Sequence, residues 1–250
     1  GKDAAARALE LDGQLAEPYA ALGYIHHRYE WDWPRAEQAY QRALALNKNY
    51  ATAHQWYSSF LASMGRAAES ISEAERARDL DPLSTPISTD LGINLYYARR
   101  FSQAVSQFQN ALELNPSAVG VHSHLGMAFE QQQQHELALA AFQRAIALAG
   151  ENSQIKLRLI RTLALAGQQA EARKLLDELQ QNAAPGTVPL YLVAGIYIAL
   201  GEKEQALGAL TQSVALREEG TIWLKVDPQL DPLRGEPRFA ALLKSVGLEK

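Results

Sequence analysis

Residues 125–148, LGMAFEQQQQHELALAAFQRAIAL, carry two helical patterns separated by a short polar turn. Apolar residues recur at helical spacing on both sides of the turn, as at Leu125 and Phe129 and again at Leu137 and Ile146. The second pattern returns along the chain, with a small residue at the same position of each segment: Ala36, Ser70, Ala104, Ala138, Ala172 and Ala206. Successive members are 34 residues apart. A fixed period of this length predicts stacked helix pairs in place of one compact domain.

The period divides the chain into six predicted units with an irregular segment at each end. The units are residues 16–50, 51–84, 85–118, 119–152, 153–186 and 187–220. The first unit is one residue longer than the others, an insertion that we place near residues 31–34. Residues 1–15 match the second helix of a truncated repeat, so we expect the chain to be a fragment that begins within a repeat. Residues 221–250 break the period and predict a turn-rich segment followed by a capping helix.

Several residues predict where helices begin and end. Gly65, Gly167 and Gly201 share one position between paired helices, where a left-handed residue ends the first helix. Asp32 is expected to cap the next helix, with Pro34 in its first turn. Asp227 precedes Pro228 in the same way at the start of the C-terminal segment. Trp31 then either packs back onto that helix as a hydrophobic staple or belongs to an aromatic binding surface.

Composition excludes several classes of protein and site. The net charge of −4 disfavours a nucleic-acid binder, and the absence of cysteine excludes disulfides, thiolate metal sites and cysteine nucleophiles. The longest apolar stretch, residues 191–200, is about half of the ~20 residues that a membrane span needs.

The sequence also lacks the signs of catalysis and of metal binding. No catalytic or phosphate-binding motif is present, so we expect no enzyme and no cofactor. Neighbouring histidines such as His26 and His27 diverge on a helix, and His26 with Glu30 lacks a third ligand, so we expect no metal site.

The 34-residue units resemble the tetratricopeptide repeat (TPR) family, whose pattern is W-x2-L-G-x2-Y…A-x3-F…P. Residues 125–148 and 21–46 carry this resemblance best, and it covers roughly residues 1–220. It implies an all-α fold: a right-handed superhelical solenoid of helix-turn-helix repeats with a C-terminal helical cap. Residues 223–248 are similar to the tails of TPR segments fused to bacterial winged-helix transcriptional regulators, nucleotide cyclases or Ser/Thr kinases. That similarity implies a signalling or transcription-regulation context.

In the TPR family, the first helices of the repeats line a concave groove that holds a peptide or protein partner. By this resemblance the partner-binding residues are Tyr24, His27, Arg28, Gln55, Trp56, Ser59, Thr89, Asp90, Tyr97, His124, Met127, Arg158, Arg161 and Tyr191. The lysine and asparagine clamp that family members use for carboxy-terminal peptides is absent. Arg158 and Arg161 lie one turn apart, which suits an acidic partner, although ordinary solvated charges are the alternative.

The resemblance therefore predicts a protein–protein interaction scaffold, the sensory or partner-binding part of a larger bacterial regulatory protein. The alternative is a structural module that mediates homo-oligomerisation, such as a homodimer. We expect no nucleic-acid contact by this segment and no membrane span. The expected compartment is the cytoplasm, or the periplasm where a membrane span precedes this segment.

Overall fold

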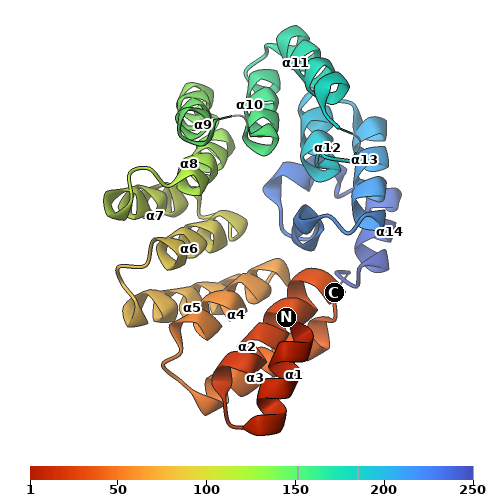
Figure 1. Cartoon of the computed structure of the whole chain (residues 1–250). Coiled ribbons are helices and arrows are strands. Elements are labelled where there is room, and N and C mark those ends of the chain that lie inside the picture. Colours follow the sequence, from red (N-terminus) through yellow and green to blue (C-terminus); the bar gives the residue numbers. More distant parts are fainter. Residues whose placement is uncertain (151, 185, 250) are drawn as a thin grey trace. The chain divides into compact units, whose positions relative to one another are not determined.

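The structure, a computed structural model of the chain, describes residues 1–150, 152–184 and 186–249. All regular secondary structure in these residues is helical, which confirms the predicted all-α class (Figure 1). The chain divides into unit 1 (Gly1–Arg100) and unit 2 (Phe101–Lys250). The helices of unit 1 are α1 (Lys2–Leu11), α2 (Ala16–Ile25), which continues into the π-helical turn η1 (His26–Glu30), α3 (Trp33–Leu46), α4 (Ala51–Ser63), α5 (Ala67–Leu80) and α6 (Thr85–Tyr97).

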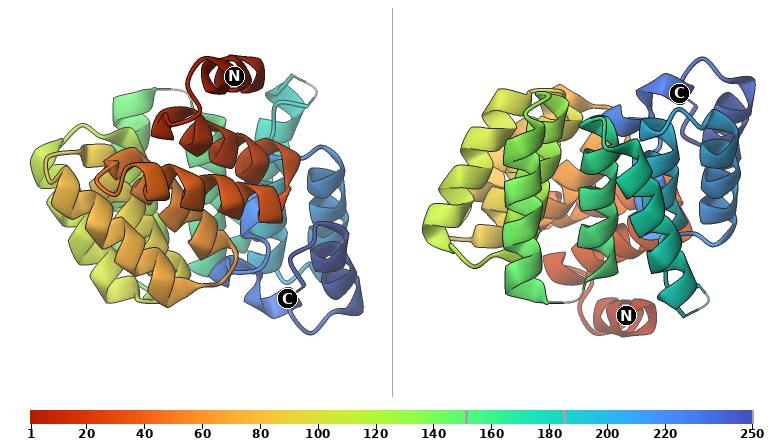
Figure 2. Two further views of the ribbon diagram at one scale, coloured as in Figure 1. Left: turned by 90° about the horizontal axis from the view of Figure 1, so that it is seen from below. Right: turned by 90° about the horizontal axis from the view of Figure 1, so that it is seen from above.

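Unit 2 continues the pattern of paired helices and ends in shorter elements. Its helices are α7 (Phe101–Leu114), α8 (Val119–Gln131), α9 (His135–Ala149), α10 (Ser153–Leu165), α11 (Gln169–Asn182), α12 (Leu190–Ala199), α13 (Lys203–Ala215), the 3₁₀ turns η2 (Glu219–Trp223) and η3 (Pro228–Leu233), and α14 (Pro237–Ser245). The pairs α4/α5 and α8/α9 each lie side by side (Figure 2). First helices also pack on one another within each unit, α4 against α2 and α6, and α10 against α8 and α12.

Small residues let the paired helices approach closely. The small residue that recurs in each second helix is fully buried at Ala36, Ala138 and Ala172. On the first helix, Gly126 allows the buried ring of Phe142 to lie on the backbone, because a Cβ there would stand 2.7 Å from the ring. Helix–helix packing at this distance requires a residue without a side chain.

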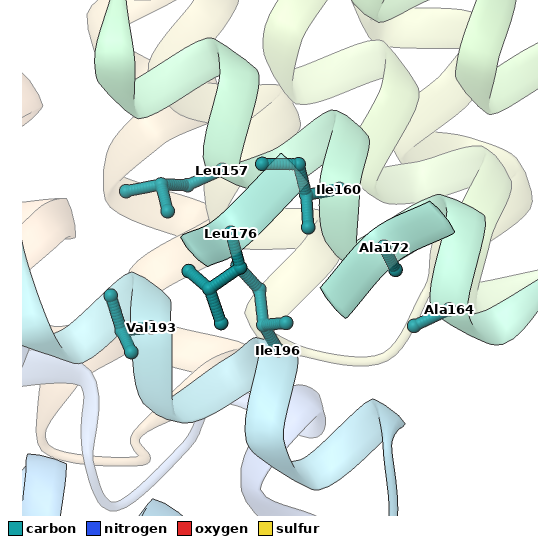
Figure 3. Packing of buried hydrophobic residues seen from close by; sticks show 7 residues of the cluster. All are labelled: Leu157, Ile160, Ala164, Ala172, Leu176, Val193 and Ile196. Atoms are coloured by element: carbon teal, nitrogen blue, oxygen red, sulfur yellow. The ribbon is translucent and has the colours of Figure 1, made fainter. Parts of the chain in front are cut away.

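Larger apolar residues fill the space between helix pairs. In unit 2, Leu157 and Ile160 of α10, Leu176 of α11, and Val193 and Ile196 of α12 form one buried cluster (Figure 3). The core is therefore shared among three successive helices, as expected where no helix pair buries its apolar stripe alone.

A left-handed residue separates the two helices of each pair. The prediction is confirmed at Gly65, Gly167 and Gly201, which have φ of 80°, 86° and 81°. The same position has positive φ at Trp31, Arg99 and Gln133, so the 34-residue spacing persists in the backbone. From Gly65 onward, the residue after each of these donates its N–H to the carbonyl five positions back, as Gln134 does to Phe129 at 3.0 Å. These bonds satisfy carbonyls that the helix end leaves open.

The left-handed position between paired helices predicts opposite effects of two substitutions on stability. A Cβ at Gly167 would meet no atom within 4 Å, so Gly167→Ala costs only the strain of a left-handed alanine, about 1 kcal/mol. Gln133→Gly relieves the same strain, and we expect it to stabilise the chain by a few tenths of a kcal/mol to about 1 kcal/mol. Urea denaturation followed by circular dichroism measures both. Stability changes of the same sign in the two variants would contradict the assignment of this backbone position as left-handed.

The extra residue of the first predicted unit lies in the helix, slightly before the expected place. Residues His26–Glu30 form a π-helical turn, and the N–H of Asp32 donates to the carbonyl of His26, six positions back, at 3.0 Å. The wider turn absorbs one residue before the left-handed Trp31. The next helix starts as predicted, because the Asp32 carboxylate accepts the N–H of Arg35 and Pro34 lies in the first turn.

The C-terminal segment packs on the last helix pair. The 3₁₀ turn η3 contacts α12, and α14, whose Phe239 and Leu242 side chains are buried, contacts α13. Asp227 caps η3 by accepting the N–H of Gln229 at 2.9 Å, as its position before Pro228 predicts. The segment thereby covers apolar surface at the end of the array.

Candidate functional site

In unit 1, eight of the predicted partner-binding residues lie half-buried on the first helices. We call this set the unit 1 face: Tyr24, Arg28, Gln55, Trp56, Ser59, Thr89, Asp90 and Tyr97. The rings of Tyr24 on α2 and Trp56 on α4 lie 4.9 Å apart, between centroids. The Arg28 guanidinium stands 5.8 Å from the centre of the Tyr24 ring. The face is therefore linked from helix to helix by aromatic and polar contacts.

Asp90 gives this face a carboxylate with unusual surroundings. Its Oδ2 accepts a hydrogen bond of 2.8 Å from Nε2 of Gln55, which joins α6 to α4. Burial raises the pKa of Asp90 to about 6, and the Gln55 hydrogen bond and the charge of Arg28 offset only part of that effect. Two other members of the face have local partners, since Thr89 donates to the carbonyl of Thr85 and the Tyr97 ring packs edge-on against Tyr96.

The structure places His27 in the interior, in contrast to the prediction for the binding surface. Its side chain is 1% exposed and its Nε2 hydrogen-bonds to Oγ of Ser63 at 3.1 Å. Burial lowers the pKa of His27 to about 3, so the imidazole is neutral. His27 lies four residues after Gly23, and the equivalent residues of the next four repeats are also buried: Ala62, Tyr96, Glu130 and Ala164. The position therefore belongs to the interior in these repeats.

In unit 2, His124 and Arg158 remain half-buried, and we call these two residues the unit 2 face. His124 stacks on Phe108 and its Nδ1 hydrogen-bonds to the carbonyl of Gly120 at 2.7 Å. Burial and the charge of Arg158 lower its pKa to about 4, so it is uncharged at neutral pH. The Arg158 guanidinium donates to the sulfur of Met127. Thioether sulfur is a weak hydrogen-bond acceptor, so the Arg158 guanidinium is suited to a stronger acceptor.

Three predicted residues of unit 2 are buried and hold the fold together. Met127 is 4% exposed and packs in the interior. Arg161 forms an ion pair of 2.5 Å with Glu130, a residue that also accepts the hydroxyl of Thr162 at 2.6 Å. Because this arginine already has a carboxylate from its own chain, it is not available to an acidic partner beside Arg158. The sequence offered no sign of Glu130 as its partner, because the two lie on different repeats.

The predicted binding residue Tyr191 instead fastens the C-terminal segment. Its hydroxyl donates to Oδ2 of Asp227 at 2.8 Å, and both side chains are buried. Nearby, the Glu218 carboxylate accepts the backbone N–H groups of Leu190 and Tyr191 at 2.9 and 2.8 Å. The sequence singled out Asp227 as a helix cap but not as the partner of a tyrosine. These residues therefore position α12 and η3 and do not form part of a surface.

The histidines make local hydrogen bonds. His26 pairs with Glu30 at 2.7 Å, and His122 bonds to the carbonyl of Pro116 at 2.9 Å. Among residues 1–150, 152–184 and 186–249, no group of three or more His, Asp or Glu side chains is placed to hold a metal ion. None of the helices in those residues has both the length and the apolar character needed to span a membrane.

Comparisons with known proteins agree with this arrangement of helix pairs. The family model of the tetratricopeptide repeat matches residues 26–85, 89–153 and 125–187, which is more than half of the chain. The chain belongs to the tetratricopeptide repeat family. The predicted resemblance is thus confirmed, and the fold is an all-α TPR solenoid.

Solved TPR structures share the fold at low sequence identity. A TPR protein from Parabacteroides merdae is 14% identical with a TM-score of 0.70, over 98% of this chain and 91% of its own. PilF of Pseudomonas aeruginosa is 18% identical with a TM-score of 0.58, over 89% of this chain and 96% of its own. A thermophilic TPR protein of Thermus thermophilus is 19% identical with a TM-score of 0.63, over 74% of this chain and 98% of its own. A comparison of the TPR chain with curated proteins finds no significant match.

Proposed function

We propose that this TPR protein is a non-catalytic scaffold whose unit 1 face and unit 2 face bind a peptide or protein partner. Family membership supports the general role, because TPR proteins mediate protein–protein interactions. The similarity of residues 223–248 to bacterial regulator tails supports a finer proposal. In that proposal the array is the partner-binding part of a larger bacterial regulatory protein in the cytoplasm.

Arg158 carries this proposal. It lies half-buried on a first helix, and the hydrogen bond that the structure shows for its guanidinium goes to the sulfur of Met127. Desolvation strengthens the attraction of such a group for a carboxylate, and arginine is among the residues that most often anchor interfaces. Because Arg161 is occupied by Glu130, Arg158 alone is the proposed anchor for an acidic side chain.

We expect Arg158→Glu to weaken binding of acidic peptides by about tenfold or more, which corresponds to about 1.4 kcal/mol. The probes are peptides recovered from a phage-displayed random library selected on the full chain, and affinity is measured by isothermal titration calorimetry. Arg144→Glu is the matched control, because Arg144 is exposed on the second helix α9. Recovery of no peptide, or equal binding by both variants, overturns the proposal.

The alternative of self-association has one observation in its favour. Leu11 on α1 is 84% exposed, so its side chain is open to a second copy of the chain. Light scattering across a range of protein concentrations tests this alternative. A mass that stays at one chain contradicts it, and a dimer that Leu11→Lys returns to one chain supports it.

A further inference from the structure

The unit 1 face contains a carboxylate that differs from its neighbours in how it is paired. Several other carboxylates of unit 1 have basic partners: Glu30 contacts Lys2, Glu37 and Glu69 contact Arg66, and Glu73 contacts His54. The contacts that the structure gives Asp90 are the neutral amide of Gln55 at 2.8 Å and the more distant charge of Arg28. Its charge is therefore poorly compensated within unit 1.

Burial makes the incomplete compensation of the Asp90 charge energetically costly. A half-buried carboxylate loses part of its hydration, and one amide hydrogen bond does not replace it. The pKa of about 6 reflects this loss, because burial stabilises the neutral acid relative to the anion more than water does. A cation placed against Asp90 removes the cost and gains a charge-assisted hydrogen bond.

Aromatic rings on the adjacent helices favour the same kind of ligand. Trp56 follows Gln55 on α4, and its ring lies 4.9 Å from that of Tyr24 on α2, tilted by 48°. Both rings are half-buried, so they present part of their surface on the first helices. Ring faces of tryptophan and tyrosine attract ammonium and guanidinium groups. The Tyr24 ring already has the Arg28 guanidinium 5.8 Å from its centre, so Trp56 is the ring that we assign to a partner's cation.

Gln55 holds the carboxylate in place between these elements. Its Nε2 donates to one oxygen of Asp90, which fixes the carboxylate on α6 relative to α4. The bond uses Oδ2, so Oδ1 remains as an acceptor for a second donor. Gln55 is therefore a positioning residue.

We propose that Asp90, together with the Trp56 ring next to Gln55 on α4, binds a lysine or arginine side chain of a partner polypeptide. This inference rests on the proposed function, since it names the chemistry of one side chain within a bound partner. It adds a basic group to the acidic group that Arg158 is expected to hold.

The test uses peptides recovered from the random library on the full wild-type chain. We expect them to contain a lysine or arginine, and replacing it by norleucine or citrulline to weaken binding by about tenfold. Asp90→Asn, whose side-chain oxygen still accepts from Gln55, is expected to weaken binding of the basic peptide by a similar factor. It should leave binding of the neutral analogue unchanged. Asp79→Asn, on the exposed surface of the second helix α5, is the matched control.

The pH dependence gives an independent measurement. Below the pKa of about 6, the Asp90 carboxyl must release a proton to accept the cation. Affinity for the basic peptide therefore rises from about pH 5 and levels off by about pH 8, whereas Asp90→Asn shows no such rise.

The outcomes separate this inference from the proposed function. Binders without basic residues, or basic binders whose affinity is the same for the wild type and Asp90→Asn, overturn the inference. If those binders still respond to Arg158→Glu, the proposed function stands. A library that yields no binder overturns both.

Discussion

Arg161→Leu is expected to destabilise the chain by about 3–5 kcal/mol, the largest effect of any substitution proposed for it. The variant leaves the Glu130 carboxylate buried with only the Thr162 hydroxyl as a donor. An uncompensated charge in the interior costs far more than the ion pair itself contributes. The midpoint of urea denaturation, followed by circular dichroism, measures the loss.

Two further variants test this explanation. Arg161→Leu combined with Glu130→Leu removes both charges and should recover most of the loss, because the Thr162 hydroxyl also bonds to the carbonyl of Arg158 at 3.0 Å. Arg173→Leu breaks the pair between the exposed Arg173 and the half-buried Glu202 and should cost less than about 1 kcal/mol. A double variant as unstable as Arg161→Leu would show that the lost packing of arginine, and not the buried charge, is responsible.

Gly126→Ala is expected to destabilise unit 2 by about 1–3 kcal/mol, although alanine favours helix over glycine. The new Cβ would stand 2.7 Å from the ring of Phe142, whose side chain is fully buried and has little room to move. Steric overlap therefore outweighs the gain in helix propensity. Thermal or urea denaturation directly shows whether Gly126→Ala lowers or raises stability.

The matched control lies on the same helix. A Cβ at Gly120 meets no atom within 4 Å, so Gly120→Ala should leave stability unchanged or raise it by up to about 1 kcal/mol. Phe142→Leu should reduce the penalty of Gly126→Ala when the two are combined, because the smaller side chain leaves space for the methyl group. If the stability changes of the two substitutions are strictly additive, the two side chains do not overlap sterically.

The repeat pattern predicted the features that recur in every helix pair. The buried alanines such as Ala36 and Ala172, and the left-handed glycines such as Gly65, were visible because each repeats at one period. The sequence also predicted the start of α3 at Asp32, because capping depends on residues that are close in the chain. Local and periodic information was sufficient for these features.

Features that occur once could not be read in the same way. The Arg161–Glu130 pair joins α10 to α8, and no spacing rule within a helix links residues on different repeats. Tyr191 was expected at a binding surface, but Asp227 lies in the C-terminal segment, which has no repeat to compare with. His27 is a different case, because its equivalents in the next repeats, Ala62 and Tyr96, are buried and the prediction did not use this periodic sign. Charged and aromatic residues at the predicted binding positions therefore divide between structure and surface.

The π-helical turn at His26–Glu30 also shows how such an array tolerates changes in chain length. The additional residue is taken up before Trp31, and the left-handed positions that follow keep their 34-residue spacing. An insertion at this point widens one helical turn and is not passed on to later repeats. Insertions of single residues should therefore be tolerated at the end of a first helix, where they alter one segment of the proposed binding surface without disturbing the others.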